Sequence, residues 1–198
     1  METSLYLIVG LGNPGEQYAR TRHNAGFIAL ERLGKSWSAQ WVFERTFCAN
    51  VADVRLQERK VLLCHPQTYM NLSGKSVASI VNYYHIKLEN LLVVSDDADL
   101  PLGIIRLRPD GGSGGHHGLE SIEQALGTQN YARLRIGIGR QSDSQCEITD
   151  YVLGEFSLKE LKILDLVLER AVKQINSWLF EGIEKAMNQY NGQVECPQ

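Results

Sequence analysis

The sequence predicts an α/β fold in a single domain, with a twisted, mixed and mostly parallel β-sheet that is flanked by helices. Two observations predict it: short apolar runs alternate with segments of helical period, and a long amphipathic helix lies near the C-terminus over residues 158–181. A chain of 198 residues, of which 43% are hydrophobic and 22% charged, is long enough to bury the core of one such domain. We assign this domain to residues 1–190 and expect residues 191–198 to form a polar, flexible tail.

Several segments have the apolar or alternating pattern of β-strands. They cover residues 5–9, 47–56, 60–64, 91–95, 104–108 and 134–138. Shorter helical segments lie between them, at residues 24–33, 73–85 and 118–126. The helix over 158–181 has the clearest boundaries, because Ser157-Leu-Lys-Glu160 is a capping box before it and Gly182 follows its last apolar turn.

Composition and charge argue against several classes of protein. No apolar run approaches the roughly 18 residues of a membrane-spanning helix, and Glu2 stands where a signal peptide would be basic. We therefore expect a cytoplasmic protein with no membrane contact. The four cysteines are far apart, with no C-x-x-C pair, so neither a zinc site nor a disulfide framework is predicted. A formal net charge of −3 argues against indiscriminate coating of nucleic acid but permits a local basic patch.

Gly10-x-Gly12-x-x-Gly15 follows the first predicted strand and matches the dinucleotide-binding fingerprint. In that fold a helix follows the glycines at once, and an acidic residue ends the second strand about 20 positions later. Here Pro14 interrupts the turn, and the region around Glu31 has helical rather than strand periodicity. The glycines therefore favour a turn that shapes the end of a strand, and a nicotinamide-dependent oxidoreductase is only a third hypothesis.

The loop Gly111-Gly-Ser113-Gly-Gly115 matches the G-x-S-x-G pattern of a nucleophile elbow. That elbow needs a histidine well after the serine, whereas the last histidines are His116 and His117, directly behind the loop. A serine nucleophile is therefore not predicted. The two histidines also make a poor metal pair, since adjacent side chains point apart and no H-x-x-x-H spacing or nearby carboxylate completes a set. We expect no metal and no cofactor.

Polar side chains remain at the ends of the predicted apolar elements, namely Asn13, His23, Asn71 and Asp96. Taken singly, the two asparagines have a plain interpretation as turn or cap formers, and the histidine and aspartate as surface groups. In an open α/β sheet, however, loops beyond the carboxyl ends of the strands converge on one crevice. Together the four groups supply a base, a carboxylate to orient it and carboxamides to bind a carbonyl, which is what metal-free ester hydrolysis needs.

Six ordered motifs carry a family resemblance. They are LIVGLGNPGEQYARTRHNAGF, PQTYMNLSGKSV, DDADLPLG, GGSGGHHGLESI, RLRIGIGR and YVLGEF. In this order, and along nearly the whole chain, they resemble the bacterial-type peptidyl-tRNA hydrolase. The resemblance implies a single-domain enzyme without metal that hydrolyses the ester between a peptide and the 3′-terminal ribose of tRNA, and thereby frees the tRNA for translation. We expect a monomer whose partner is peptidyl-tRNA.

The resemblance also implies roles for single residues. His23 would be the general base and Asp96 its orienting carboxylate. The substrate would be bound by Asn13 and Asn71, with Tyr18 and Met70 lining the cleft. At His117 the sequence departs from the family, whose members usually carry asparagine there to hold a water or the tRNA end. Because relatives in plant organelles act in intron splicing, a non-catalytic RNA-binding protein that acts in RNA processing is the alternative.

Arginines alternate along two predicted strands. They are Arg106 and Arg108 on one strand, and Arg133 and Arg135 on a later one, with Arg140 behind it. On one face of a sheet this alternation makes a basic strip suited to tRNA phosphates, and the alternative is a solvated face paired with acidic residues. Arg20 and Arg22 are expected to meet the 3′ end of the tRNA, because they flank the predicted base. The backbone N–H groups of residues 111–118 are a further candidate phosphate site.

Overall fold

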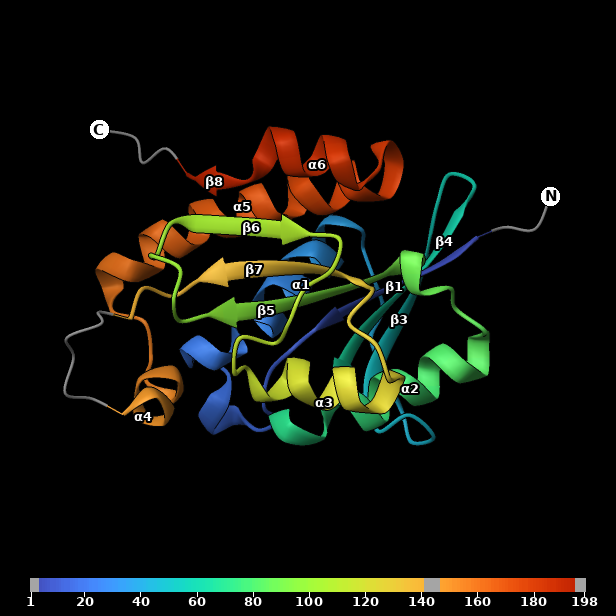
Figure 1. Ribbon diagram of the computed structural model, residues 1–198, viewed down its shortest axis with the longest axis horizontal. Coiled ribbons are helices and arrows are strands. Elements are labelled where there is room, and N and C mark those ends of the chain that lie inside the picture. Colours follow the sequence, from blue (N-terminus) through green and yellow to red (C-terminus); the bar gives the residue numbers. More distant parts are fainter. Residues whose placement is uncertain (1–3, 141–146, 195–198) are drawn as a thin grey trace.

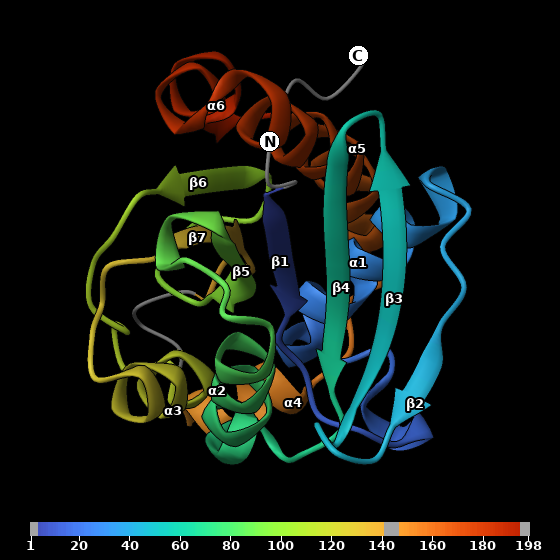
Figure 2. The same cartoon turned by 90° about the vertical axis from the view of Figure 1, so that its right-hand side faces the viewer.

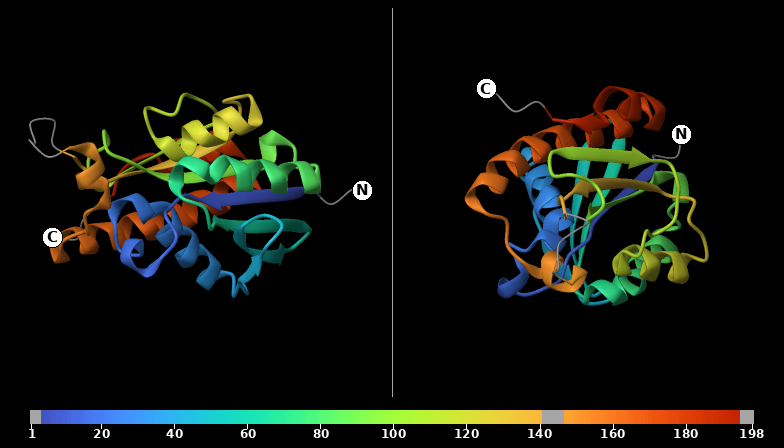
Figure 3. Two further views of the ribbon diagram at one scale, coloured as in Figure 1. Left: turned by 90° about the horizontal axis from the view of Figure 1, so that it is seen from below. Right: turned by 60° about the vertical axis from the view of Figure 1, so that its left-hand side comes forward.

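One twisted sheet lies between two groups of helices in the computed structural model, which describes residues 4–140 and 147–194 (Figures 1 and 3). Within these ranges the strands follow the order β2-β3-β4-β1-β5-β7-β6-β8. They are β1 (Leu5–Gly10), β2 (Val42–Glu44), β3 (Ala49–Leu56), β4 (Arg59–Pro66), β5 (Leu91–Asp97), β6 (Ile104–Arg108), β7 (Ala132–Gly137) and β8 (Gly192–Gln193). The helices are α1 (Ala25–Ser36), α2 (Ser73–Tyr84), α3 (His117–Leu126), α4 (Ile148–Leu153), α5 (Leu158–Glu181) and α6 (Ile183–Tyr190). Short 3-10 helices connect them: η1 (Glu16–Tyr18), η2 (Arg22–Asn24), η3 (Met70–Leu72) and η4 (Leu88–Asn90).

The centre of the sheet is parallel and its two edges are antiparallel. Strand β1 pairs in parallel with β4 and β5, and β5 pairs in parallel with β7. The pairs β2–β3, β3–β4, β6–β7 and β6–β8 are antiparallel. The predicted α/β fold with a mixed sheet and a parallel centre is therefore confirmed. The carboxyl ends of the central strands all meet at one edge of the sheet, as parallel pairing requires.

Two apolar cores lie on opposite faces of the sheet. Figure 2 shows helices on both faces. Successive side chains of a strand point to opposite faces, so Ile8 joins the core beneath α1 and α5, while Leu7 and Val9 join the core beneath α2 and α3. All three side chains are fully buried. Covering both faces explains why the central strands are almost continuously apolar in the sequence.

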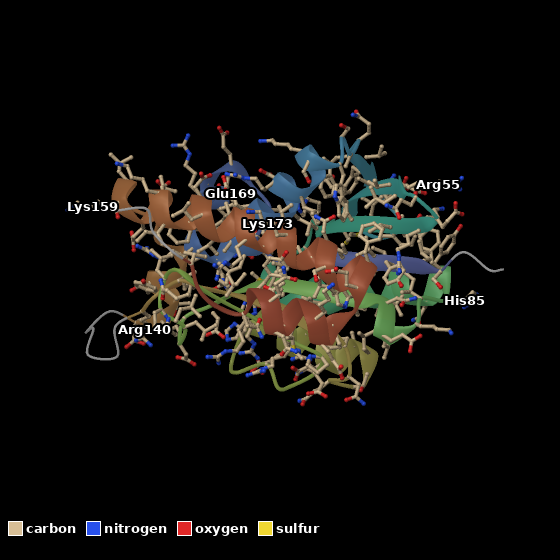
Figure 4. The ribbon with its side chains drawn as sticks, turned by 90° about the horizontal axis from the view of Figure 1, so that it is seen from above. Arg55, His85, Arg140, Lys159, Glu169 and Lys173 are labelled. Atoms are coloured by element: carbon tan, nitrogen blue, oxygen red, sulfur yellow. The ribbon has the colours of Figure 1, made fainter. Side chains whose placement is uncertain are left out.

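Helix α5 begins and ends where the sequence predicts. The capping box is present, because the Ser157 hydroxyl accepts from the Glu160 N–H (3.3 Å) and the Glu160 carboxylate accepts from the Ser157 N–H (2.7 Å). Figure 4 shows Lys159, Glu169 and Lys173 on the outer surface of this helix. No helix in the described part of the chain is long and apolar enough to span a membrane.

Strands β2 and β8 and helices α4 and α6 were not predicted. The first three have six residues or fewer, too few for their periodicity to be recognised. Residues 191–194 also differ from the predicted flexible tail, since the Asn191 side chain both accepts from and donates to the backbone of Leu107 (2.6 and 3.1 Å). Val194 is buried as well. The remainder of the predicted tail, 195–198, lies outside the described residues.

The cysteines that can be compared with the prediction are Cys48 and Cys64, and both are free thiols. Cys48 is exposed and Cys64 is buried in strand β4. Cys146 and Cys196 lie outside the described residues.

Candidate active site

A cavity of about 340 Å³ opens at the carboxyl ends of the central strands. In Figure 1 the arrows of β5 and β7 point toward this end of the molecule, where α4 lies beside the segment that contains η1 and η2. The residues that line the cavity come from widely separated parts of the chain. They include Asn13, His23, Tyr69, Met70, Asn71, Asp96, Ser113, His116, His117, Leu119, Ile148, Val152 and Leu153. Six of the predicted site residues are therefore brought together, from segments that start at residue 13 and end at residue 117.

Asp96 is the centre of the site. Its Oδ1 lies 2.9 Å from Nδ1 of His23 and 2.9 Å from Nε2 of His116, and its side chain is only 2% exposed. Burial raises the pKa of Asp96, but the adjacent His116 and His23 and their hydrogen bonds outweigh burial and hold that pKa well below its ordinary range. An ionised Asp96 accepts from Nδ1 of His23. This leaves the Nε2 lone pair of His23 as the base in the cavity.

His116 has its proton on Nε2, because its other nitrogen is an acceptor. Nδ1 of His116 accepts from the N–H groups of Gly118 (3.1 Å) and Leu119 (3.4 Å), so this side chain caps α3. A ring nitrogen that accepts there cannot carry the proton, and Nε2 therefore donates to Asp96. His116 ties the start of α3 to the acid, a role the sequence analysis missed.

The prediction that no carboxylate lies near His116 is wrong, because the ligating atoms of His23, Asp96 and His116 lie within 4.8 Å of one another. A metal at Nε2 of His116 would need the lone pair of that nitrogen. Nε2 holds a proton as long as Nδ1 caps α3. The cluster therefore fits a hydrogen-bonded acid–base set better than a cation site.

Asn13 is oriented by three hydrogen bonds. Its Oδ1 accepts from the Met70 N–H (2.8 Å), and its backbone N–H and C=O bind the carboxamide of Asn24 (2.9 and 3.0 Å). Because Oδ1 is occupied, the Nδ2 donor is the group left to bind a ligand in the cavity.

The glycines before Asn13 serve close packing rather than a pyrophosphate. A Cβ at Gly10 would collide with the backbone carbonyl of Gly26 in α1, and a Cβ at Gly12 would lie 2.6 Å from the Phe27 ring. The chain then enters η1 and η2 rather than an immediate α-helix. This geometry does not fit the dinucleotide-binding hypothesis.

Asn71 and His117 are exposed residues that line the cavity, so their side chains can reach a ligand from its rim. Tyr18 is not among the residues that line this cavity, and its contact with the substrate stays a prediction. The chain turns back after η1, where the Tyr18 carbonyl accepts from the N–H and hydroxyl of Thr21 (3.0 and 2.8 Å). This turn brings His23 to the cavity and leaves Tyr18 outside it.

The predicted arginine strip is divided between exposed and buried side chains. Arg106 is opposite Arg135 and Arg108 is opposite Arg133, so all four belong to one face of the sheet. Arg106 and Arg108 are exposed. Strand β8 pairs only with Ile104 and Ile105, at the start of β6.

Arg133 is the member of the strip that the prediction misplaced, because its side chain is fully buried. It forms an ion pair with Glu123 (3.2 Å) and donates to the carbonyls of Gln129 (2.8 Å) and Gly112 (3.3 Å). A guanidinium occupied in this way is not available to a phosphate. The prediction of a phosphate contact at Arg133 is wrong, since β7 is an interior strand covered by α3 and the glycine loop.

Helix α4 supplies a wall of the cavity that the sequence analysis missed. Its residues Ile148, Thr149, Val152 and Leu153 line the cavity. Arg22, which was expected to face the tRNA end, instead forms an ion pair with Glu160 (3.1 Å) and is mostly buried. The motif YVLGEF carried the only sequence signal for this wall.

The comparisons with known proteins agree over nearly the whole chain. The family model described as "Peptidyl-tRNA hydrolase" matches residues 7–197. The chain belongs to the peptidyl-tRNA hydrolase family. Among similar family members, proteins named peptidyl-tRNA hydrolase from Gloeobacter violaceus and Thermosynechococcus vestitus are each 46% identical and cover 94% and 97% of both chains. The crystal structure of the family member from Acinetobacter baumannii superposes with a TM-score of 0.91, at 36% identity over 98% of both chains.

Proposed function

We propose that this chain hydrolyses the ester that joins a peptide, or an N-blocked amino acid, to the 3′-terminal ribose of tRNA. The observation that carries the proposal is the pair of hydrogen bonds that His23 and His116 make to one oxygen of the buried Asp96, beside the oriented carboxamide of Asn13. Membership of the peptidyl-tRNA hydrolase family supports the choice of substrate. The relatives named above are called hydrolases, so the comparisons lend no support to a non-catalytic RNA-binding role.

In the proposed mechanism, Nε2 of His23 removes a proton from a water molecule as the water oxygen attacks the ester carbonyl. Asp96 stabilises the imidazolium that forms, because its carboxylate accepts from Nδ1. The Nδ2 group of Asn13 donates to the developing oxyanion. When the bond from the carbonyl carbon to the ribose oxygen breaks, the proton passes from His23 to that oxygen. The products are a peptide with a free carboxyl group and a free tRNA.

Substrate binding is proposed to divide between two surfaces. Asn71 and His117 would contact the peptide and the tRNA end from the rim of the cavity, and Met70 would pack against the peptide. Arg106 and Arg108, which are exposed on β6, would bind tRNA phosphates. The proposal includes a reaction without metal and a monomeric protein of the cytoplasm.

The test is incubation of the protein with N-acetyl-aminoacyl-tRNA and measurement of the released N-acetyl amino acid. Release by the parent is expected, and His23→Ala should lower kcat about 10²- to 10⁴-fold while tRNA binding is retained, because a base acts on chemistry rather than on encounter. His85→Asn is the matched control, since His85 is exposed after α2 and Figure 4 shows it at the opposite end of the molecule from Arg140, which follows β7. No release by the parent at stoichiometric enzyme would refute the function, and an active His23→Ala would refute the assignment of the base.

A further inference from the structure

Arg22, the residue before the proposed base, is bound by residues of α4, of α5 and of the turn between these two helices. Its Nη2 donates to both carboxylate oxygens of Glu160 (3.2 and 3.1 Å), and the carbon of its guanidinium lies 4.5 Å from the centre of the Tyr151 ring. Its backbone N–H donates to the Gly154 carbonyl (2.9 Å). The side chain is 13% exposed, so both the charge and the backbone of Arg22 are committed to these elements.

Further contacts hold α4 and the turn after it, both to the segment before His23 and to the end of β7. Thr21 and Glu155 form an antiparallel β-bridge, and the Tyr151 hydroxyl donates to the Ile138 carbonyl beyond β7 (2.7 Å). Gly154 leaves room for the arginine, because a Cβ there would lie 2.9 Å from Nη1 of Arg22. One side of α4 is therefore fixed both to the sheet and to the residue beside His23.

The other side of α4 faces the cavity. Ile148, Val152 and Leu153 are apolar residues of this wall, with Tyr69 and Met70 of the η3 segment also lining the cavity. Because Arg22 is bonded to α4 at Gly154 and adjoins His23 in the chain, it spans the connection between the base and this apolar wall. A shift in that connection changes how a bound group on the wall is presented to the base.

We propose that Arg22 is a positioning residue for peptidyl-tRNA hydrolysis. Through Glu160 and Tyr151 it sets the placement of the α4 wall relative to His23. A peptide side chain that packs on the wall is thereby held so that its ester carbonyl meets the base. This inference rests on the proposed function. It adds the expectation that the effect of removing Arg22 on KM depends on the size of the amino acid next to the ester.

The test compares Arg22→Met with the parent on N-acetyl-phenylalanyl-tRNA and N-acetyl-glycyl-tRNA. Methionine retains an apolar side chain but lacks the donors and the charge. We expect KM for the phenylalanyl substrate to rise about tenfold, because a pocket whose apolar wall is misplaced loses apolar contacts with the substrate side chain. KM for the glycyl substrate, which has no such side chain, should change less than about threefold. Both substrates should also lose about tenfold in kcat through misplacement of the base.

Arg32→Met is the matched control, because Arg32 of α1 also pairs with an acidic residue of α5, Asp165, but at the exposed surface. Its kinetic constants should equal those of the parent for both substrates. Glu160→Gln removes the charge that Arg22 binds. It should also raise KM more for the phenylalanyl than for the glycyl substrate, by a smaller factor than Arg22→Met does. Arg22→Lys, which keeps the charge but not the bidentate geometry, should fall between parent and Arg22→Met.

All assays are run well below the melting temperature of each variant, measured by circular dichroism. Equal losses of kcat on both substrates with unchanged KM values in Arg22→Met, or no loss at all, would overturn the inference. The proposed function would still stand in that case if the parent hydrolyses both substrates. A parent that hydrolyses neither substrate would refute both. If Arg22→Met does not fold, Arg22→Lys and Glu160→Gln decide the question by the same split.

Discussion

Arg106 and Arg133 face the same side of the sheet on neighbouring strands, yet their surroundings are opposite. Arg133, on the interior strand β7, is fully buried and paired with Glu123, whereas Arg106, on β6, is exposed. Two histidines show the same contrast. His65 in β4 is buried between the rings of Phe27 and Trp41, at centroid distances of 4.6 and 4.3 Å, while His117 is exposed at the rim of the cavity.

This difference indicates which polar groups maintain the fold and which meet the substrate. A buried charge or imidazole has already committed its interactions to the protein, so its replacement changes stability. An exposed group at the rim has its interactions open to a ligand, so its replacement changes binding. The distinction is tested by pairing each variant with a matched control, so that a change in stability can be told apart from a change in substrate binding.

The largest effect is expected for Arg133→Met. Removing the guanidinium leaves the Glu123 carboxylate, whose side chain is 14% exposed, with a hydrogen bond from the Gln129 carboxamide but without the charge of Arg133. Breaking a buried ion pair costs about 3–5 kcal/mol. Urea denaturation should show this loss in the free energy of unfolding. The matched variant Arg106→Met should stay within about 0.5 kcal/mol of the parent. A loss below 1 kcal/mol in Arg133→Met would mean that Arg133 is not a structural charge.

The second effect concerns acid stability and His65. Burial lowers the pKa of His65 to about 3, from an ordinary value of 6.5, with a smaller opposing contribution from a backbone hydrogen bond to Phe27. Between these values the unfolded chain binds a proton that the folded protein does not. Above pH 6.5 the ionisation of His65 therefore costs no stability. As the pH falls from 6.5 toward 3, it lowers the free energy of unfolding by up to about 1.4 kcal/mol per pH unit.

His65→Phe keeps an aromatic ring in the stack and removes the titration, so below pH 6 its unfolding free energy should fall less steeply than that of the parent. His85→Asn is the control, because His85 is exposed and its left-handed backbone conformation suits asparagine. Equal slopes in the parent and His65→Phe would show that His65 takes up a proton in the folded protein.

A smaller effect is expected for Arg106→Ala at the open edge of the sheet. If Arg106 contacts a phosphate, the slope of log affinity against log salt concentration should decrease in magnitude by about one unit for a double-helical tRNA segment. Arg55→Ala is the control, since Arg55 is an exposed residue of β3, which is separated from β6 by β4, β1, β5 and β7 in the sheet. An unchanged slope in Arg106→Ala, measured by titration between 50 and 200 mM salt, roughly the range over which such losses are seen, would make Arg106 an ordinary surface charge.

The smallest effect is expected for His117→Asn. A neutral imidazole offers one donor and one acceptor, whereas a carboxamide offers two donors and an acceptor. The variant should remain at least as active as the parent, with kcat/KM on N-acetyl-aminoacyl-tRNA equal to or above the parent's, because the carboxamide offers a substrate at the rim one more donor. A kcat/KM that falls about tenfold or more would contradict this expectation and show that the imidazole itself contacts the substrate.

Local patterns in the sequence predicted the elements whose causes are local. The capping box at Ser157 and Glu160 fixes the start of α5 within four residues, and the central strands are apolar because both faces of the sheet are covered. The grouping of Asn13, His23, Asn71 and Asp96 followed from a rule about strand ends, which needs only the order of the elements.

Features that depend on contacts between distant segments could not be predicted in this way. Adjacent histidines suggested side chains that diverge, and only the fold shows that His116 meets Asp96. The alternation of Arg133 with Arg135 predicted the correct face of the sheet, but nothing near them in the sequence reports that α3 brings Glu123 over that face. Helix α4 has only six residues, and its Tyr151 contacts Arg22, 129 positions earlier, and the Ile138 carbonyl beyond β7.

The contact between Arg22 and Glu160 also has a consequence for synthesis of the chain on the ribosome. Translation proceeds from the N-terminus, and a domain can complete its tertiary structure only after its last essential segment has emerged. The groups around His23 draw on residues as late as Glu160, and strand β1 at the centre of the sheet waits for β5, more than 80 residues behind it. A nascent chain in which Glu160 has not yet emerged therefore lacks an assembled site.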